Sequence, residues 1–327
     1  MNEQERNVFL HKEVVKRYDY LVENGYNVIA VFLQGSQNYE LDLYDKDYKS
    51  DVDVKAIVVP TLQDIVLNYK PISTTIVLEN NEHIEVKDIR VMIEMFIKQN
   101  ISYIELLYTK YKKVNPEYKV FIDNLLNIRD EISNINKNQF LRCIKGMSME
   151  KLKALEHPYP NTIDKIKKFG YDPKQLHHIV RLNEFVYRYL IEKEKLENCY
   201  ISKNKKELID IKKGKYNLED ARTLALTFDN GTKELCDLYI EKEDKINNET
   251  IDKLKKINCD IIEFSLKKEL LSKRVDYISV KEVKAPFKTI KDKSIRMTIE
   301  DYKKDIKDET MCDYCIYENI VINNIYE

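Results

Sequence analysis

The sequence is poor in glycine and proline, with six Gly and seven Pro among 327 residues. Both residues interrupt regular structure, so their scarcity predicts a protein with much helix. The sequence also lacks an excess of charge of either sign, because 55 Lys and Arg stand against 56 Asp and Glu, giving a net charge of −1. This balance excludes a large basic field for nonspecific binding of nucleic acid or membranes, although a local basic site remains compatible with it.

Long apolar runs are missing too, and the six cysteines are scattered. No run approaches the ~20 residues that cross a bilayer, and the polar, acidic N-terminus is not a signal peptide. The pair Cys312 and Cys315 has no second pair or well-spaced His nearby to complete a zinc site, so we interpret it as two ordinary thiols. We therefore expect a cytoplasmic protein with reduced thiols and no membrane partner. The sequence does not indicate its oligomeric state.

The pattern of apolar residues predicts an α+β fold in two parts. Up to residue 114 strands and helices mix, whereas from about 115 the strand signal disappears and only helical periodicity remains. We expect an α/β core over 1–114, a helical domain over 115–275 and an extension of unknown role over 276–327. The expected strands are 27–34, 51–59, 74–78 and 83–87, and the expected helices are 4–24, 61–69, 88–98, 103–108, 117–125, 135–156, 162–169, 173–196, 205–213, 218–241 and 248–272. Asn230-Gly231 is a candidate break in the helix over 218–241.

Two features of the core suggest a site for phosphate and metal. Gly35 and Ser36 directly follow an apolar strand, where a glycine lets backbone N–H groups approach phosphate oxygens and Ser36 could begin a helix. Asp51 and Asp53 stand at i and i+2 in a strand, so both carboxylates point to one face. Two such charges repel unless a cation lies between them, and Mg²⁺ bridging to phosphates is a common solution. The alternative is a solvated loop followed by an edge strand with exposed acids.

A second group of polar residues lies at the start of the helix expected over 173–196. Lys174, His178 and Arg181 stand at i, i+4 and i+7 and so form one stripe, which fits a polyphosphate. The alternative is a solvated polar face. Arg142 and Lys145, on the preceding helix, are additional candidates for the same role. We interpret the lysine-rich stretch 203–215 as a solvated helix face.

The order of these motifs resembles the DNA polymerase β-like nucleotidyltransferase superfamily, whose hallmark is Gly-Ser followed by Asp-x-Asp. The closest likeness is to a group of predicted bacterial and phage nucleotidyltransferases with Gly-Ser-x-x-Tyr, Ser-Asp-x-Asp and Gly-Tyr-Asp-x-Lys-x-x-x-His-x-x-Arg. The matching residues are Gly35, Ser36, Tyr39, Ser50, Asp51, Asp53, Gly170, Tyr171, Asp172, Lys174, His178 and Arg181. The family's glycine after the tyrosine is Glu40 here. The stretch from Leu208 to Ala221 resembles the family's Leu-x-x-Ile-Lys-x-Gly segment.

The resemblance implies a third carboxylate that would complete a two-metal site. We choose Glu85, because Ile84 and Val86 alternate with it and turn it away from the apolar face. Asp88 is the second choice, although it is also suited to cap the helix that follows, and the family's acid could instead correspond to His83. Further on, Asn100 and Glu105 match a family segment that ends in Glu-Leu-Leu, and we give them no catalytic role because helix packing and capping account for them.

The resemblance thus implies a polymerase β-type nucleotidyltransferase core with a mixed sheet, followed by a helical domain that completes the nucleotide site. Asp51, Asp53 and Glu85 would hold two Mg²⁺ ions, for which Mn²⁺ could substitute, while Gly35, Ser36, Lys174, His178 and Arg181 would bind the nucleoside triphosphate (NTP). The expected reaction moves a nucleoside monophosphate to an acceptor hydroxyl on an RNA or tRNA end, a protein side chain or a small molecule. The alternatives are a degenerate nucleotidyltransferase that binds nucleotide or a partner without catalysis, and a helical scaffold with an incidental Asp-x-Asp.

Overall fold

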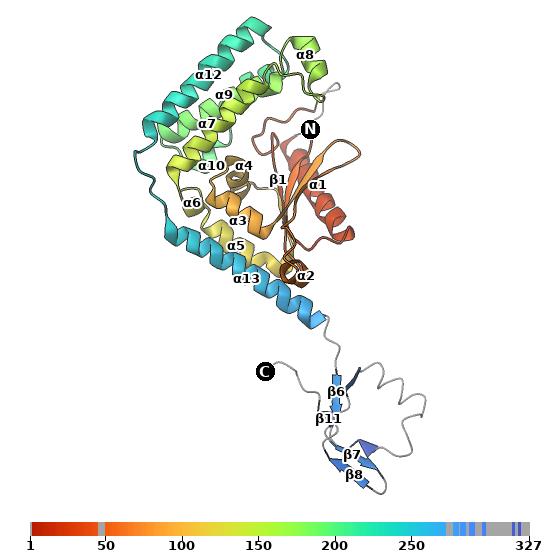
Figure 1. Ribbon diagram of the computed structural model, residues 1–327. Helices are drawn as coiled ribbons and strands as arrows, with labels where there is room; N and C mark the ends of the chain where they lie inside the picture. Colours follow the sequence, from red (N-terminus) through yellow and green to blue (C-terminus); the bar gives the residue numbers. More distant parts are fainter. Residues whose placement is uncertain are drawn as a thin grey trace. The chain divides into compact units, whose positions relative to one another are not determined.

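The computed structural model describes residues 2–44 and 50–272, and beyond them the backbone of the short strands β6–β11 (Figure 1). The chain is α+β, with a five-stranded mixed sheet and many helices, as the sequence predicts. It divides into two compact units, residues 1–265 and 266–327, with the boundary inside helix α13 (Asn248–Ser272). The expected α/β core over 1–114 therefore shares one unit with most of the helical segment expected over 115–275.

The sheet of the first unit has the order β3-β4-β2-β1-β5. Its strands are β1 (Val28–Leu33), β2 (Val54–Val58), β3 (Ser73–Val77), β4 (His83–Asp88) and β5 (Lys112–Val114). Strand β2 runs parallel to β4 and antiparallel to β1, while β3 and β5 are antiparallel edge strands. The sequence analysis missed β5, because three residues, two of them lysine, carry no readable alternation.

Each face of the sheet packs against helices (Figure 1). Helix α1 (Glu3–Glu23) covers one face with Leu10, Val14 and Leu21, which lie in one apolar cluster with Val54, Ala56 and Val58 of β2. The other face joins a larger cluster that continues without interruption into the helical part. This face is covered by α3 (Ile89–Ile97), α4 (Ile101–Ile104) and the 3₁₀ turn η1 (Glu105–Tyr108), and α2 (Leu62–Val66) follows β2.

The helical part packs around α9 (Pro173–Leu190), which contacts α7 (Lys137–Ala154), α11 (Lys205–Lys212) and α12 (Leu218–Tyr239). Asp172 caps α9 and Pro173 occupies its first turn, as the sequence predicts. Helix α12 continues through Asn230 and Gly231, so the break considered there is absent. The remaining elements are η2 (Pro116–Tyr118), α5 (Lys119–Asn127), α6 (Arg129–Ile132), α8 (Ile163–Phe169) and α10 (Leu196–Cys199).

In the second unit, strands β6 (Tyr277–Val280), β9 (Arg296–Thr298) and β11 (Ile320–Val321) form one small sheet. Strands β7 (Glu282–Ala285), β8 (Lys288–Lys291) and β10 (Ile316–Tyr317) form another. The sequence analysis assigned no structure to this segment. Cys312 and Cys315 lie outside the described residues. Among the helices that the structure describes, none is both long enough and apolar enough to cross a membrane.

Candidate functional site

A cavity of about 620 Å³ lies between the sheet and the helical part of the first unit. Its lining includes Gly35, Ser36, Asp51 and Asp53 from the turn after β1 and the approach to β2. Lys174 and His178 of α9 line the same cavity. The structure therefore brings together two motifs that stand more than a hundred residues apart in the sequence. The volume falls in the range of small-ligand sites.

The two aspartates lie just before β2, where the chain enters the sheet, so the expected strand over 51–59 begins only at Val54. Asp51 is exposed, and its carbonyl accepts a hydrogen bond from the Gln37 side chain. Asp53 is half-buried, and its Oδ1 accepts a hydrogen bond of 2.8 Å from the backbone N–H of His83. The His83 ring lies beside the same oxygen, with Nδ1 at 3.3 Å. Both carboxylates thus reach the cavity, with Asp53 fixed against β4.

The segment after β1 is a tight turn rather than the start of a helix. Gly35 adopts a left-handed backbone with φ of 85°, which favours glycine. The N–H groups of Asn38, Tyr39 and Leu41 then turn back to the carbonyls of Gly35 and Ser36, at 2.9–3.2 Å. Ser36 therefore lies at the cavity edge within a turn, and the expected helix start there is wrong.

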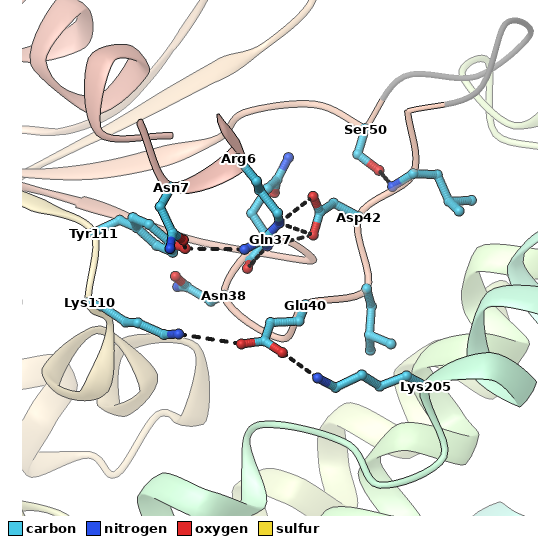
Figure 2. A network of polar contacts seen from close by, with 12 residues as sticks. Arg6, Asn7, Gln37, Asn38, Glu40, Asp42, Ser50, Lys110, Tyr111 and Lys205 are labelled. Atoms are coloured by element: carbon cyan, nitrogen blue, oxygen red, sulfur yellow. Dashed lines mark hydrogen bonds and ion pairs between the residues drawn. The ribbon is translucent and has the colours of Figure 1, made fainter. Parts of the chain in front are cut away.

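Glu40, in the turn after β1, forms ion pairs with two lysines (Figure 2). Its φ of 58° is also left-handed, so this position favours a residue without a side chain. Here the carboxylate instead pairs with Lys110 of the core and Lys205 of α11. These ion pairs lower the pKa of Glu40, with the Lys205 contact as the largest cause. The side chain thus ties the turn to the helical part across the molecule.

A second ion pair fixes the turn to helix α1 (Figure 2). The guanidinium of Arg6 donates to both oxygens of Asp42, and its Nη2 donates to the carbonyl of Gln37 at 2.6 Å. No sequence pattern around Arg6 or Asp42 predicts that the two residues form an ion pair. Together with Glu40 and Lys205, they hold this turn from two sides.

The helical wall of the cavity is strongly basic. Besides Lys174 it presents three lysines that the sequence analysis did not propose: Lys151, Lys165 and Lys212. Lys212 also donates to the carbonyl of Leu41 at 3.2 Å and to Ser50 Oγ at 3.3 Å. Burial and repulsion from Lys174 lower the pKa of Lys212 to about 8. The interpretation of 203–215 as a solvated face is therefore wrong for Lys205 and Lys212. The signal that could have identified Lys212 is the Leu-x-x-Ile-Lys-x-Gly likeness, in which Lys212 is the lysine.

The remaining candidates on the helices divide into two groups. His178 faces the cavity, where burial holds its pKa well below the usual value, so the ring is neutral. The neighbouring His177 donates from Nδ1 to the Leu208 carbonyl, 2.8 Å away, and burial lowers the pKa of His177 to about 3. Arg142 and Lys145, in contrast, pair with Asp244 and Asp237 and do not line the cavity.

Arg181 does not reach the cavity wall. It is 7% exposed, and its guanidinium lies 3.8 Å from the centre of the Tyr39 ring. The Tyr39 hydroxyl in turn donates to Glu105, a buried carboxylate that does line the cavity. Burial raises the pKa of Glu105. Arg181, Tyr39 and Glu105, which belong to three separate motifs, thus form one buried cluster next to the cavity.

The acids considered as the third carboxylate are held by other groups. Glu85 is not among the lining residues, and it pairs with Lys55 and Lys87 and accepts a hydrogen bond of 2.6 Å from Tyr103. Burial opposes its ionisation, but the Lys55 ammonium and these hydrogen bonds lower the pKa of Glu85 to about 2. Asp88 caps α3 and pairs with Arg90, as the capping argument predicts. Asn100 likewise caps α4.

The residues present fit one divalent cation better than two. Asp51 and Asp53 offer the oxygen ligands that Mg²⁺ takes alongside substrate phosphates. Within residues 2–44 and 50–272, no three His, Cys, Asp or Glu side chains gather in a way that could hold a metal ion. A second ion at Glu85 would have to displace the Lys55 ammonium from a largely buried ion pair, which leaves that ammonium without its carboxylate partner.

Comparisons with known proteins give little further guidance. The chain matches no protein-family model, and no curated protein matches it. Among solved structures it is similar to a nucleotidyltransferase-like protein from Exiguobacterium sibiricum 255-15, with 11% sequence identity. The match covers 86% of this chain and 97% of that chain, at a TM-score of 0.26. A likeness at this level fixes neither the fold nor the activity of the chain.

Proposed function

We propose that the chain binds a nucleoside triphosphate with Mg²⁺ in the cavity and transfers its nucleotidyl group to an acceptor hydroxyl. One observation carries the proposal: the aspartates before β2 and the cations of α9 and α11 line the same cavity from opposite sides. An acidic edge suits a divalent cation, and a basic wall suits the phosphates that this cation neutralises. A solvated loop or an incidental Asp-x-Asp would not require this convergence.

The residues of the chain take distinct parts in the proposed reaction. The Gly35-Ser36 turn and the lysines of the helical wall orient the triphosphate, and Arg181 acts indirectly through Tyr39. The acceptor oxygen attacks the α-phosphorus, the bond from that phosphorus to the oxygen bridging to the β-phosphate breaks, and pyrophosphate leaves while the hydroxyl proton passes to water. Mg²⁺ held by Asp51 and Asp53 would offset charge on the phosphates during this in-line step.

A second candidate function is nucleotide binding without transfer, as in a degenerate enzyme that acts as a regulator. The observation that favours it is the state of Glu85, whose carboxylate is already committed to Lys55, Lys87 and Tyr103. This candidate shares the cavity and the Mg²⁺-dependent binding of the first. It differs only in predicting no release of pyrophosphate with any acceptor.

Transfer of label from the four α-³²P-labelled NTPs, in the presence of Mg²⁺, tests the proposal. Total RNA, tRNA and a cell lysate serve as acceptors, so that label in RNA, protein or small molecules identifies the acceptor class. We expect transfer by wild type and none by the double variant Asp51→Asn/Asp53→Asn. Full transfer by the double variant would contradict the mechanism, and NTP binding without any transfer would favour the regulator.

A further inference from the structure

The number of divalent ions that the cavity can hold depends on which side chains of β4 lie beside Asp51 and Asp53. Strands β2 and β4 run parallel, with Lys55 paired to Glu85 and Val54 paired to Ile84. Because side chains alternate along a strand, Asp53 and Lys55 share a face of the sheet with His83 and Glu85. His83 is the β4 residue that contacts Asp53, through its N–H and its ring. At the level of the aspartates, β4 therefore offers an imidazole, whereas Mg²⁺ prefers oxygen ligands.

One step further along the same face lies Glu85, and both of its oxygens are engaged. Oε2 accepts from the Lys55 ammonium, while Oε1 accepts from the Tyr103 hydroxyl at 2.6 Å and lies 3.1 Å from Lys87 Nζ. A metal ion at Glu85 would have to displace these donors.

Lys55 is itself built into the site. The residue is 5% exposed and lines the cavity. The ammonium donates to Gln34 Oε1 at 2.6 Å and lies 4.7 Å from the centre of the Tyr103 ring. A positive charge fixed in this wall, on the same strand face as Asp53, would repel a second cation placed beside it.

We propose that the cavity takes a single divalent ion with its nucleotide, held by Asp51 and Asp53, and that the Lys55–Glu85 ion pair closes the position of a second ion. This inference rests on the proposed function, because it concerns the same nucleotide site. It assigns Lys55 a role that no sequence motif indicates: its ammonium occupies Glu85 Oε2 and would repel a second cation beside Asp53.

Counting ions in the nucleotide complex tests this inference without relying on activity. Wild type is saturated with Mn²⁺ and the α,β-methylene analogue of each NTP in turn, and native mass spectrometry gives the number of Mn²⁺ ions bound with the analogue. Low-temperature electron paramagnetic resonance then reports whether two ions interact, since paired ions lie about 3.5–4 Å apart. We expect one ion and an uncoupled spectrum.

Three variants test which residues determine the number of bound ions. Glu85→Gln should keep one ion, whereas a two-metal site that uses Glu85 would lose one. Lys55→Ala should free Oε2 of Glu85 and raise the count to two, provided that the circular dichroism spectrum shows the variant to be folded. Lys113→Ala, which changes a lysine of β5 outside the cavity lining, serves as the control and should keep one ion.

The outcomes separate the two proposals. Two ions in wild type, or an ion lost in Glu85→Gln, would overturn the single-ion inference while leaving the nucleotide site in place. A folded Lys55→Ala variant that still holds one ion would overturn the part given to the Lys55–Glu85 pair. If no analogue binds with Mn²⁺ at all, the proposed function itself fails.

Discussion

Replacing Lys212 with alanine should weaken nucleotide binding, although this lysine lies far from the aspartates in the sequence. Its ammonium lines the cavity and also donates to Leu41 O and Ser50 Oγ, so it is held at the junction of the turn and the helical wall. We expect the ammonium also to donate to a phosphate oxygen of the bound NTP, and a hydrogen bond between charged groups contributes about 1.5–3 kcal/mol. Loss of this bond in Lys212→Ala corresponds to an increase of about 10- to 150-fold in the Kd of the NTP.

The pH dependence gives the same prediction a second readout. Because burial and Lys174 lower the pKa of Lys212 to about 8, its charge is present below pH 8 and is lost as the pH rises through that value. The terminal phosphate of the nucleotide is already ionised there, since its pKa is about 6. Wild-type affinity should therefore fall between pH 7 and pH 9. Lys212→Arg keeps its charge across this range and should show a flatter profile.

Calorimetric titration with an α,β-methylene NTP and Mg²⁺ at pH 7, 8 and 9 measures both effects. Lys206→Ala is the matched control, because Lys206 lies on the same helix and is exposed. It should bind as wild type does. Wild-type affinity in the Lys212→Ala variant, or an identical pH profile in Lys212→Arg, would refute the assignment of Lys212 to the phosphates.

Three further predictions concern stability. Because the pKa of Glu85 is lowered from 4.5 to about 2, its ionised carboxylate stabilises the fold above pH 4.5, and this contribution is lost as the pH falls through 2. In urea titrations the stability difference between wild type and Glu85→Gln should therefore shrink on going from pH 6 to pH 2, and a constant difference would contradict the ion pair. At Glu40, the glycine variant should be more stable than the alanine variant by about 1 kcal/mol, since both lose the ion pairs but only glycine relieves the left-handed backbone; equal urea midpoints would refute this. Gly214→Ala should lower the free energy of unfolding by at least about 1 kcal/mol, because φ is 85° and a Cβ would lie 2.3 Å from the Phe169 ring; an unchanged thermal midpoint would contradict it.

Local patterns in the sequence were enough to predict most of the elements and the two halves of the cavity. The alternation around Ile84 and Val86 placed Glu85 on the correct face of β4, and both apolar neighbours are buried. Helical spacing placed Lys174, His178 and Arg181 on one stripe. The capping signals at Asp172, Asp88 and Asn100 identified the starts of three helices correctly.

Contacts between distant residues were beyond the reach of these patterns. Nothing near Glu85 shows that Lys55, thirty residues earlier, is its partner on the neighbouring strand. The stripe on α9 likewise does not show that Tyr39 covers its last member, so Arg181 is buried while Lys174 reaches the cavity. The role of Lys205 depends in the same way on Glu40, which lies across the molecule.

The central claim is that the aspartates before β2 and Lys174 of α9 bind one and the same nucleotide. Calorimetric titration of wild type, Asp51→Asn/Asp53→Asn and Lys174→Ala with an α,β-methylene NTP, with and without Mg²⁺, tests it most directly. We predict Mg²⁺-dependent binding in wild type that the double aspartate variant loses and that Lys174→Ala weakens about tenfold or more. Binding that needs no Mg²⁺, or that either variant retains at wild-type affinity, would contradict the claim.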